Sequence, residues 1–119
     1  MKKVLIIDDD KVFRTSLTKM LVKAGYATVT ASEGEEGLTL FKEGAIDLVI
    51  TDIIMPRMEG IETIVELRKL QSDLKIIAIS GGGKLPPEKH LQNAKALKVN
   101  AVLKKPFSFK QLEAILSTL

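Results

Sequence analysis

The sequence predicts an α/β fold built on one doubly wound parallel sheet. Short apolar, β-branched runs alternate along the chain with segments in which apolar residues recur at helical spacing. This alternation favours a parallel sheet covered by helices on both faces. The length of 119 residues, with 45% hydrophobic and 28% charged residues, is typical of a single globular domain. We therefore expect one domain over residues 1–119, made of five strand-helix units.

Each strand is expected where a β-branched run is bounded by turn residues or charges. The second run alternates and is weaker than the others, which suits a strand at the edge of the sheet. The predicted strands are Val4–Ile7, Ala27–Ala31, Asp47–Thr51, Lys75–Ser80 and Ala101–Leu103.

The helix boundaries are predicted from capping residues. Asp10 is expected to cap the first helix, and Gly25 to end it in a left-handed conformation. The later starts are predicted at two capping boxes, Ser32 with Glu35 and Ser108 with Gln111, at Gly60, and at Pro86-Pro87. The predicted buried faces are Phe13, Leu17, Met20, Leu21 and Ala24; Leu38 and Phe41; Ile61, Ile64, Val65 and Leu67; Leu91, Ala94 and Leu97; and Phe109, Leu112, Ile115, Leu116 and Leu119.

Composition excludes several classes of function. The chain has no cysteine, so it offers no disulfide, thiolate metal site or thiol nucleophile. The net charge of +3 is scattered, without a run of five like charges, and gives little support to nucleic-acid binding. The apolar stretch after Met1-Lys2-Lys3 is too short for a signal peptide or a membrane span. A cytoplasmic protein is the expectation.

Charged and hydroxyl side chains stand where the predicted strands end. Asp8 and Asp9 follow the first strand, Asp52 follows the third, Ser80 closes the fourth, and Lys105 comes just after the fifth. In open α/β sheets, ligands bind outside the carboxyl ends of the strands. Acids that meet at one sheet edge predict a metal site, and an added hydroxyl and ammonium predict that it handles a phosphoryl group.

These features together resemble the response-regulator receiver domain. The most specific piece runs from Asp52 to Gly60, Asp-Ile-Ile-Met-Pro-Arg-Met-Glu-Gly, which matches the family pattern Asp-x-x-Met-Pro-x-Met-x-Gly. The Asp8-Asp9 pair, Ser80 and the Lys105-Pro106-Phe107 segment agree in order and spacing. The resemblance covers the whole chain and implies a flavodoxin-like sheet of five strands in the order 2-1-3-4-5, with five helices.

The resemblance also implies a role for each site residue. Asp52 would be the phosphoacceptor, attacking a phosphohistidine to form an acyl phosphate. Asp9 and Asp52, with the main-chain carbonyl of Ile54, would ligate one Mg²⁺. Asp8 would act mainly through a coordinated water. Lys105 and Ser80 would contact the phosphoryl oxygens, as a point charge and a hydrogen-bond donor. Neither Asp10 nor Lys104 is expected in the site.

The implied partners are proteins. A sensor histidine kinase or a phosphotransfer protein would supply the phosphoryl group. A downstream protein would bind the surface formed by the fourth helix, the fifth strand and the fifth helix. On this reading the chain is a regulatory phosphoacceptor that catalyses only its own phosphorylation and dephosphorylation, and it binds neither nucleic acid nor a membrane.

One position departs from the family pattern. Receivers often carry an aromatic residue three positions before the lysine, and here that position is Val102. The loop Gly81–Gly83 is therefore expected to carry more of the conformational change. We also predict a cis peptide bond between Lys105 and Pro106, because X–Pro is the usual setting for such bonds and receiver domains usually have one here.

Two other functions compete with this reading. A phosphatase of the haloacid-dehalogenase kind needs a second acid two residues after the nucleophile, where this chain has Ile54. A flavodoxin-type flavin carrier needs a hydroxyl-rich phosphate loop and stacking rings, but the three aspartates after the first strand would repel the phosphate, and aromatic content is 4%. A stand-alone receiver and a receiver cut from a longer regulator would have the same sequence.

Overall fold

A computed structural model of the chain describes residues 2–53, 60–80 and 98–119. The described strands are β1 (Lys3–Ile7), β2 (Ala27–Ala31), β3 (Leu48–Asp52), β4 (Lys75–Ser80) and β5 (Ala101–Lys104). The described helices are α1 (Lys11–Lys23), α2 (Gly34–Glu43), α3 (Gly60–Leu70) and α5 (Phe109–Leu116). The helix predicted to start at Pro86-Pro87 and the Gly81–Gly83 loop lie outside the described residues.

The five strands form one parallel sheet in the order β2-β1-β3-β4-β5, which confirms the predicted topology. The register pairs Ile7 of β1 with Thr51 of β3, and Ser80 of β4 with Lys104 of β5. Neighbouring strands therefore end close to the same level, at one edge of the sheet.

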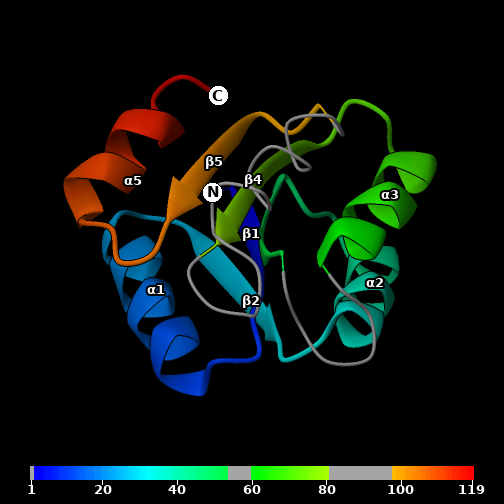
Figure 1. The fold of residues 1–119 in the computed structure, drawn as a ribbon, viewed down its shortest axis with the longest axis horizontal. Coiled ribbons are helices and arrows are strands. Elements are labelled where there is room, and N and C mark those ends of the chain that lie inside the picture. The colour runs from blue at the N-terminus through cyan, green and yellow to red at the C-terminus, as the bar shows by residue number, and fades with distance from the viewer. Residues whose placement is uncertain (1, 54–59, 81–97) are drawn as a thin grey trace.

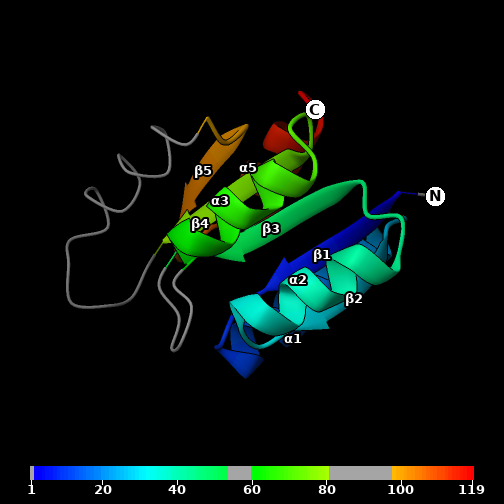
Figure 2. The same ribbon diagram turned by 90° about the vertical axis from the view of Figure 1, so that its right-hand side faces the viewer.

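Helices cover both faces of the sheet. In Figure 1, α1 and α5 lie on one face, and α2 and α3 lie on the other; the turned view in Figure 2 agrees. Each face buries its own apolar cluster, one containing Leu17, Leu21 and Leu112 against the sheet, the other Phe41 and Leu67. β1 and β3 are buried on both sides, as expected for central parallel strands.

Most of the predicted boundaries are confirmed. The Asp10 carboxylate accepts the Phe13 N–H at 3.1 Å and so caps α1, and Gly25 adopts a φ of 97° after it. The capping box of Ser108 and Gln111 opens α5 with both of its hydrogen bonds in place.

Three local predictions are wrong. The Ser32–Glu35 capping box does not form, because α2 starts one residue later than that box requires. The carboxylate of Glu36, in place of Glu35, accepts the Ser32 N–H at 2.7 Å. Ala24, predicted on the buried face of the first helix, is exposed because it lies past the last residue of α1, as its C-cap. Three strand bounds differ by one residue: β3 begins and ends one residue later than predicted and so includes Asp52, β1 begins one residue earlier, and β5 ends one residue later.

None of the described helices combines the length and apolar character that a membrane span requires.

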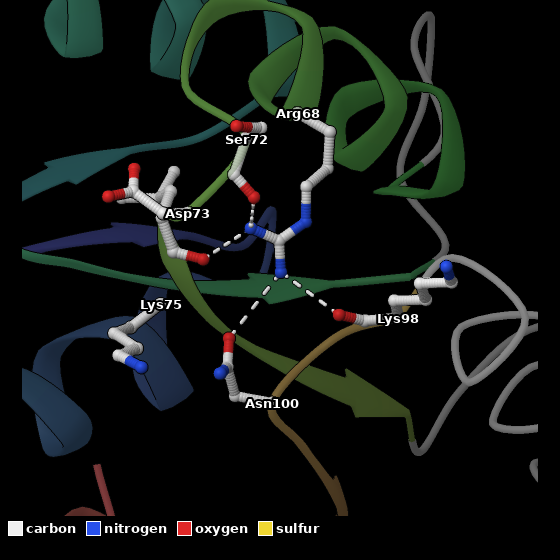
Figure 3. A pocket seen from close by; sticks show the side chains of 7 residues that line it. Arg68, Ser72, Asp73, Lys75, Lys98 and Asn100 are labelled. Atoms are coloured by element: carbon white, nitrogen blue, oxygen red, sulfur yellow. Dashed lines mark hydrogen bonds between the residues drawn. The ribbon is translucent and has the colours of Figure 1, made fainter.

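A hollow of about 500 Å³ lies at the sheet edge opposite the predicted site, around Arg68 of α3 (Figure 3). The Arg68 guanidinium donates to the main-chain oxygens of Ser72, Leu74 and Lys98 and, at 3.4 Å, to Oδ1 of Asn100. One side chain thus ties the end of α3 and the turn before β4 to the segment that enters β5. With these four acceptors the guanidinium is already occupied.

We predict that Arg68→Ala lowers the free energy of unfolding by about 1–3 kcal/mol, because it leaves main-chain carbonyls without their donor. The matched control is Lys69→Ala. Lys69 is an exposed neighbour that pairs with Glu66 at 3.2 Å, and its loss should change stability by roughly 0.5 kcal/mol or less. Urea unfolding of both variants measures the difference. Equal midpoints would show that the Arg68 contacts add nothing to stability.

Candidate functional site

Four strand ends bring the candidate residues to one edge of the sheet. Asp8 directly follows β1, Asp52 ends β3, Ser80 ends β4, and Lys105 directly follows β5. The Lys105 N–H donates to the Ser80 carbonyl at 2.7 Å, which extends the pairing of these two strands into the site. The parallel register therefore gathers side chains that lie far apart in the sequence.

Three carboxylates converge at this edge. Asp8, Asp9 and Asp52 each offer an oxygen, and these oxygens all lie within 4.8 Å of one another. Asp8 and Asp52 are only 1% and 5% exposed, whereas Asp9 is exposed. The cluster is thus buried at its base and open to solvent at Asp9.

The ammonium of Lys105 lies between two of these acids. Its Nζ is 2.8 Å from Asp8 Oδ2 and 3.0 Å from Asp52 Oδ2, and its side chain is 17% exposed. The contact with Asp52 is an aligned hydrogen bond, whereas Asp8 Oδ2 is held as an ion pair without hydrogen-bond alignment. The peptide bond from Lys105 to Pro106 is cis, which confirms the prediction.

Burial dominates the electrostatics of Asp8. Loss of solvent raises the pKa of its carboxyl from 3.8 to about 6, and the negative charge of Asp52 adds to the rise. The ammonium of Lys105 and the Asp10 N–H, which donates to Asp8 Oδ1 at 2.8 Å, oppose it without cancelling it. The Asp8 carboxyl is therefore harder to ionise in the folded protein than in water, and further positive charge beside it would favour its ionised form.

Burial also acts on Lys105, in the opposite sense. Loss of solvent lowers the pKa of its ammonium, but Asp8 and Asp52 together raise that pKa by more, so the net shift is upward. The lysine therefore stays charged at neutral pH.

The remaining predicted residues differ in where they lie. Ser80 is 1% exposed, and its Oγ has no hydrogen-bond partner among the described residues. Lys104 is exposed, outside the cluster. The main-chain carbonyl of Ile54, expected as a metal ligand, belongs to a residue outside those described.

The donor set suits a hard divalent cation. Carboxylate oxygens are the ligands that Mg²⁺ prefers, and it binds readily through one or two of them while keeping several waters. Asp8 Oδ2 is buried and has no aligned hydrogen-bond donor. Its negative charge is therefore only partly compensated by the Lys105 ammonium. A cation held by Asp9 and Asp52, beside Asp8, would compensate the rest.

Comparison with known proteins agrees with the geometry. A family model described as the response regulator receiver domain matches residues 4–117. The chain belongs to this family. Receiver domains are regulatory parts of two-component systems, and among the curated relatives is a probable transcriptional regulator, ycf27, of Guillardia theta, 41% identical over 113 residues. That match covers 95% of this chain and 43% of the relative, so the chain spans less than half the length of that regulator.

Solved receiver structures share the fold over nearly the whole chain. The chemotaxis protein CheY4 of Vibrio cholerae has a TM-score of 0.87 at 31% identity, covering 99% of this chain and 98% of that one. The response regulator TrrA of Thermotoga maritima, solved with Mg²⁺ and BeF, has a TM-score of 0.86 at 34% identity, with the same coverage.

Sequence reasoning did not foresee what Gly60 does in this receiver domain. A Cβ at Gly60 would lie 1.8 Å from the main-chain oxygen of Asp52 and 2.4 Å from the Cα of Ile53. The Gly60 N–H also donates to the Ile53 carbonyl at 2.6 Å. The start of α3 therefore presses directly on the backbone that carries Asp52. The motif from Asp52 to Gly60 contained the signal, but periodicity treats Gly60 only as a helix start.

Arg14 was also missed. It lies on α1, and its Nη1 donates to the main-chain oxygen of Asp8 at 2.6 Å. This bond holds the chain just after β1, where the first two acids stand.

We predict that Gly60→Ala destabilises the domain by about 1–3 kcal/mol, the usual cost of overpacking, despite the better helix propensity of alanine. It should also weaken Mg²⁺ binding, because the backbone at Asp52 must move. The control is Gly44→Ala, whose Cβ would meet the flexible end of Lys3 at 3.3 Å and no other described side chain or backbone atom within 4 Å. Thermal unfolding and metal titration check both effects, and wild-type values for Gly60→Ala would contradict the close approach.

We predict a pH-dependent difference in stability between wild type and Asp8→Asn in chelator. The raised pKa of Asp8 means that the folded state binds its proton more tightly than the unfolded state does. The charged carboxylate of Asp8 therefore destabilises the folded wild type. This destabilisation is fully present above about pH 6, shrinks as pH falls, and is absent below 3.8. Between pH 7 and pH 4 the wild type should gain on the order of 2–3 kcal/mol relative to the variant. Denaturant unfolding across this range measures the gain. Parallel pH profiles would contradict the raised pKa.

Proposed function

We propose that the chain is a phospho-accepting switch in which Asp52 receives a phosphoryl group from the phosphohistidine of a sensor kinase or phosphotransfer protein. The observation that carries the proposal is the position of the Asp52 carboxylate. It is nearly buried, hydrogen-bonded to Lys105 at 3.0 Å, and grouped with Asp8 and Asp9 within 4.8 Å. Family membership supports the same reading.

The transfer exchanges one bond for another. A carboxylate oxygen of Asp52 attacks phosphorus, the P–N bond to the donor imidazole breaks, and its electron pair stays on the imidazole nitrogen. The product is an acyl phosphate. In hydrolysis, water attacks phosphorus, the bond between phosphorus and the Asp52 oxygen breaks with its electron pair staying on that oxygen, and inorganic phosphate and a proton are released as the Asp52 carboxylate is regenerated. The protein itself carries the phosphoryl group and returns to its starting state only when that group is lost. It therefore acts as a switch and not as an enzyme with a separate substrate.

The residues around Asp52 neutralise and orient the incoming group. Lys105 already stands beside the acceptor oxygen, so its ammonium pairs with the phosphoryl oxygens as they arrive. The Ser80 hydroxyl, buried and unpartnered among the described residues, donates to one of them. Asp9, Asp52 and the main-chain carbonyl of Ile54 would hold a Mg²⁺ ion, with Asp8 acting through a coordinated water, and the ion would supply further neutralisation of charge.

The signal leaves through the surface that contains β5 and α5. Lys105 directly follows β5, and α5 starts at Phe109, so the described part of this surface adjoins the site in the sequence. A downstream protein that binds this surface in one phosphorylation state is the proposed partner. The expected fourth helix, the rest of this surface, lies outside the described residues.

We predict that acetyl phosphate with Mg²⁺ adds one phosphoryl group to the wild-type protein and none to Asp52→Asn. The control is Asp47→Asn, which changes an exposed carboxylate at the other end of β3 that accepts the Lys3 N–H at 2.8 Å. That variant should be modified like the wild type. Intact-mass spectrometry reads all three. An adduct that survives in Asp52→Asn, or fails only in Asp47→Asn, would place the acceptor elsewhere.

A further inference from the structure

The ammonium of Lys105 has a third neighbour, an aromatic ring. Its Nζ lies 4.1 Å from the ring centroid of Phe13, in addition to its contacts with Asp8 and Asp52. The same ring packs against Phe107, with centroids 5.5 Å apart and planes tilted by 50°. The lysine therefore lies between two carboxylates and an aromatic face.

The main chain of Phe13 is itself connected to the site by hydrogen bonds. The Asp8 carboxylate accepts the Asp10 N–H at 2.8 Å through Oδ1, and the Asp10 carboxylate accepts the Phe13 N–H at 3.1 Å. The Phe13 ring then meets Lys105, whose ammonium returns to Asp8 Oδ2 at 2.8 Å. In the order Asp8, Asp10, Phe13 and Lys105, each residue contacts the next, and Lys105 contacts Asp8 again.

The face of an aromatic ring attracts a cation, and the attraction grows when the cation is shielded from water. Lys105 meets that condition, because its side chain is only 17% exposed. An aliphatic side chain at position 13 would fill similar space without attracting the charge. The chemistry of the ring, and not only its bulk, thus acts on the lysine.

We infer that Phe13 is a positioning residue for Lys105: its ring holds the ammonium beside the acceptor oxygen of Asp52, where phosphoryl oxygens arrive. The inference rests on the proposed function for its effect on rate. Phe13, in the first turn of α1, would then help to orient the lysine that meets the phosphoryl group. Its position in the apolar stripe of the helix indicates only a packing role.

The first test separates ring electronics from packing. Phenylalanines with one, two and three ring fluorines, introduced at position 13, keep the shape of the ring but weaken its attraction for cations. The rate of Asp52 phosphorylation by acetyl phosphate at saturating Mg²⁺ should fall stepwise along the series. Phe13→Leu should reduce the rate roughly 2- to 30-fold, the equivalent of a cation–π contact, and Phe13→Tyr should restore most of it. The same fluorinated residues at Phe109, in α5, are the control and should leave the rate unchanged.

The second test needs neither metal nor phosphoryl donor. Protons that lie over a ring face are shifted upfield in NMR spectra, so the ε-methylene protons of Lys105 should show this shift in the wild type and in Phe13→Tyr, and lose it in Phe13→Leu. Thermal melting confirms that each variant is folded.

The outcomes distinguish this inference from the proposed function. A flat fluorine series at wild-type rates, or an unshifted lysine in the folded wild type, would overturn the role of Phe13 and leave the phosphoacceptor intact. If the wild type took no phosphoryl group at Asp52, the proposed function would fail, and the NMR shift alone would then decide whether the ring holds the lysine.

Discussion

The pairing of one ammonium with two buried carboxylates is the interaction on which the rest of this structure depends. Lys105 bridges Asp8, after β1, and Asp52, at the end of β3, from its own place after β5. Without the lysine, two nearly buried acids would face each other in a region of low dielectric, where like charges repel strongly. Removing one member of a buried charged group typically costs about 3–5 kcal/mol. The charged groups of the candidate site therefore also connect the ends of three strands.

These ionic contacts are possible because the fold brings the ends of the strands together. Because all strands run parallel and stay in register, a residue just past one strand meets residues just past its neighbours. The two apolar clusters pack helices against both faces of the sheet. Gly60 refines the position further, because the absence of a side chain lets α3 approach the backbone of Asp52.

Much of this could be read from the sequence because it follows from short-range rules. The strand ends, and the grouping of Asp8, Asp9, Asp52 and Lys105 at one sheet edge, followed from the hydrophobic runs and the residues that close them. The strand order followed from the resemblance to receiver domains. Position 13 was assigned to the buried face of α1 by periodicity, but periodicity cannot say that a lysine from the far end of the chain lies over the ring.

The local errors have similar causes. Two consecutive glutamates follow Ser32, and spacing alone could not decide which one would turn back to it. The backbone approach at Gly60 depends on how α3 packs, which no local pattern encodes. Local signals therefore predict elements and their ends, while contacts between elements require the folded chain.

The short path from Lys105 to α5 has a thermodynamic consequence. Only Pro106 and Phe107 separate the lysine from Ser108, whose hydroxyl and main-chain N–H both belong to the capping box of the helix. Coupling between two sites is reciprocal, so any effect of the phosphoryl group on this helix start implies an equal effect in return. A protein that binds the first turn of α5 more tightly in one phosphorylation state would change the free energy of phosphorylation. That change would equal the change that phosphorylation makes in the free energy of binding of that protein. The output partner would then shift the equilibrium between the phosphorylated and unphosphorylated states.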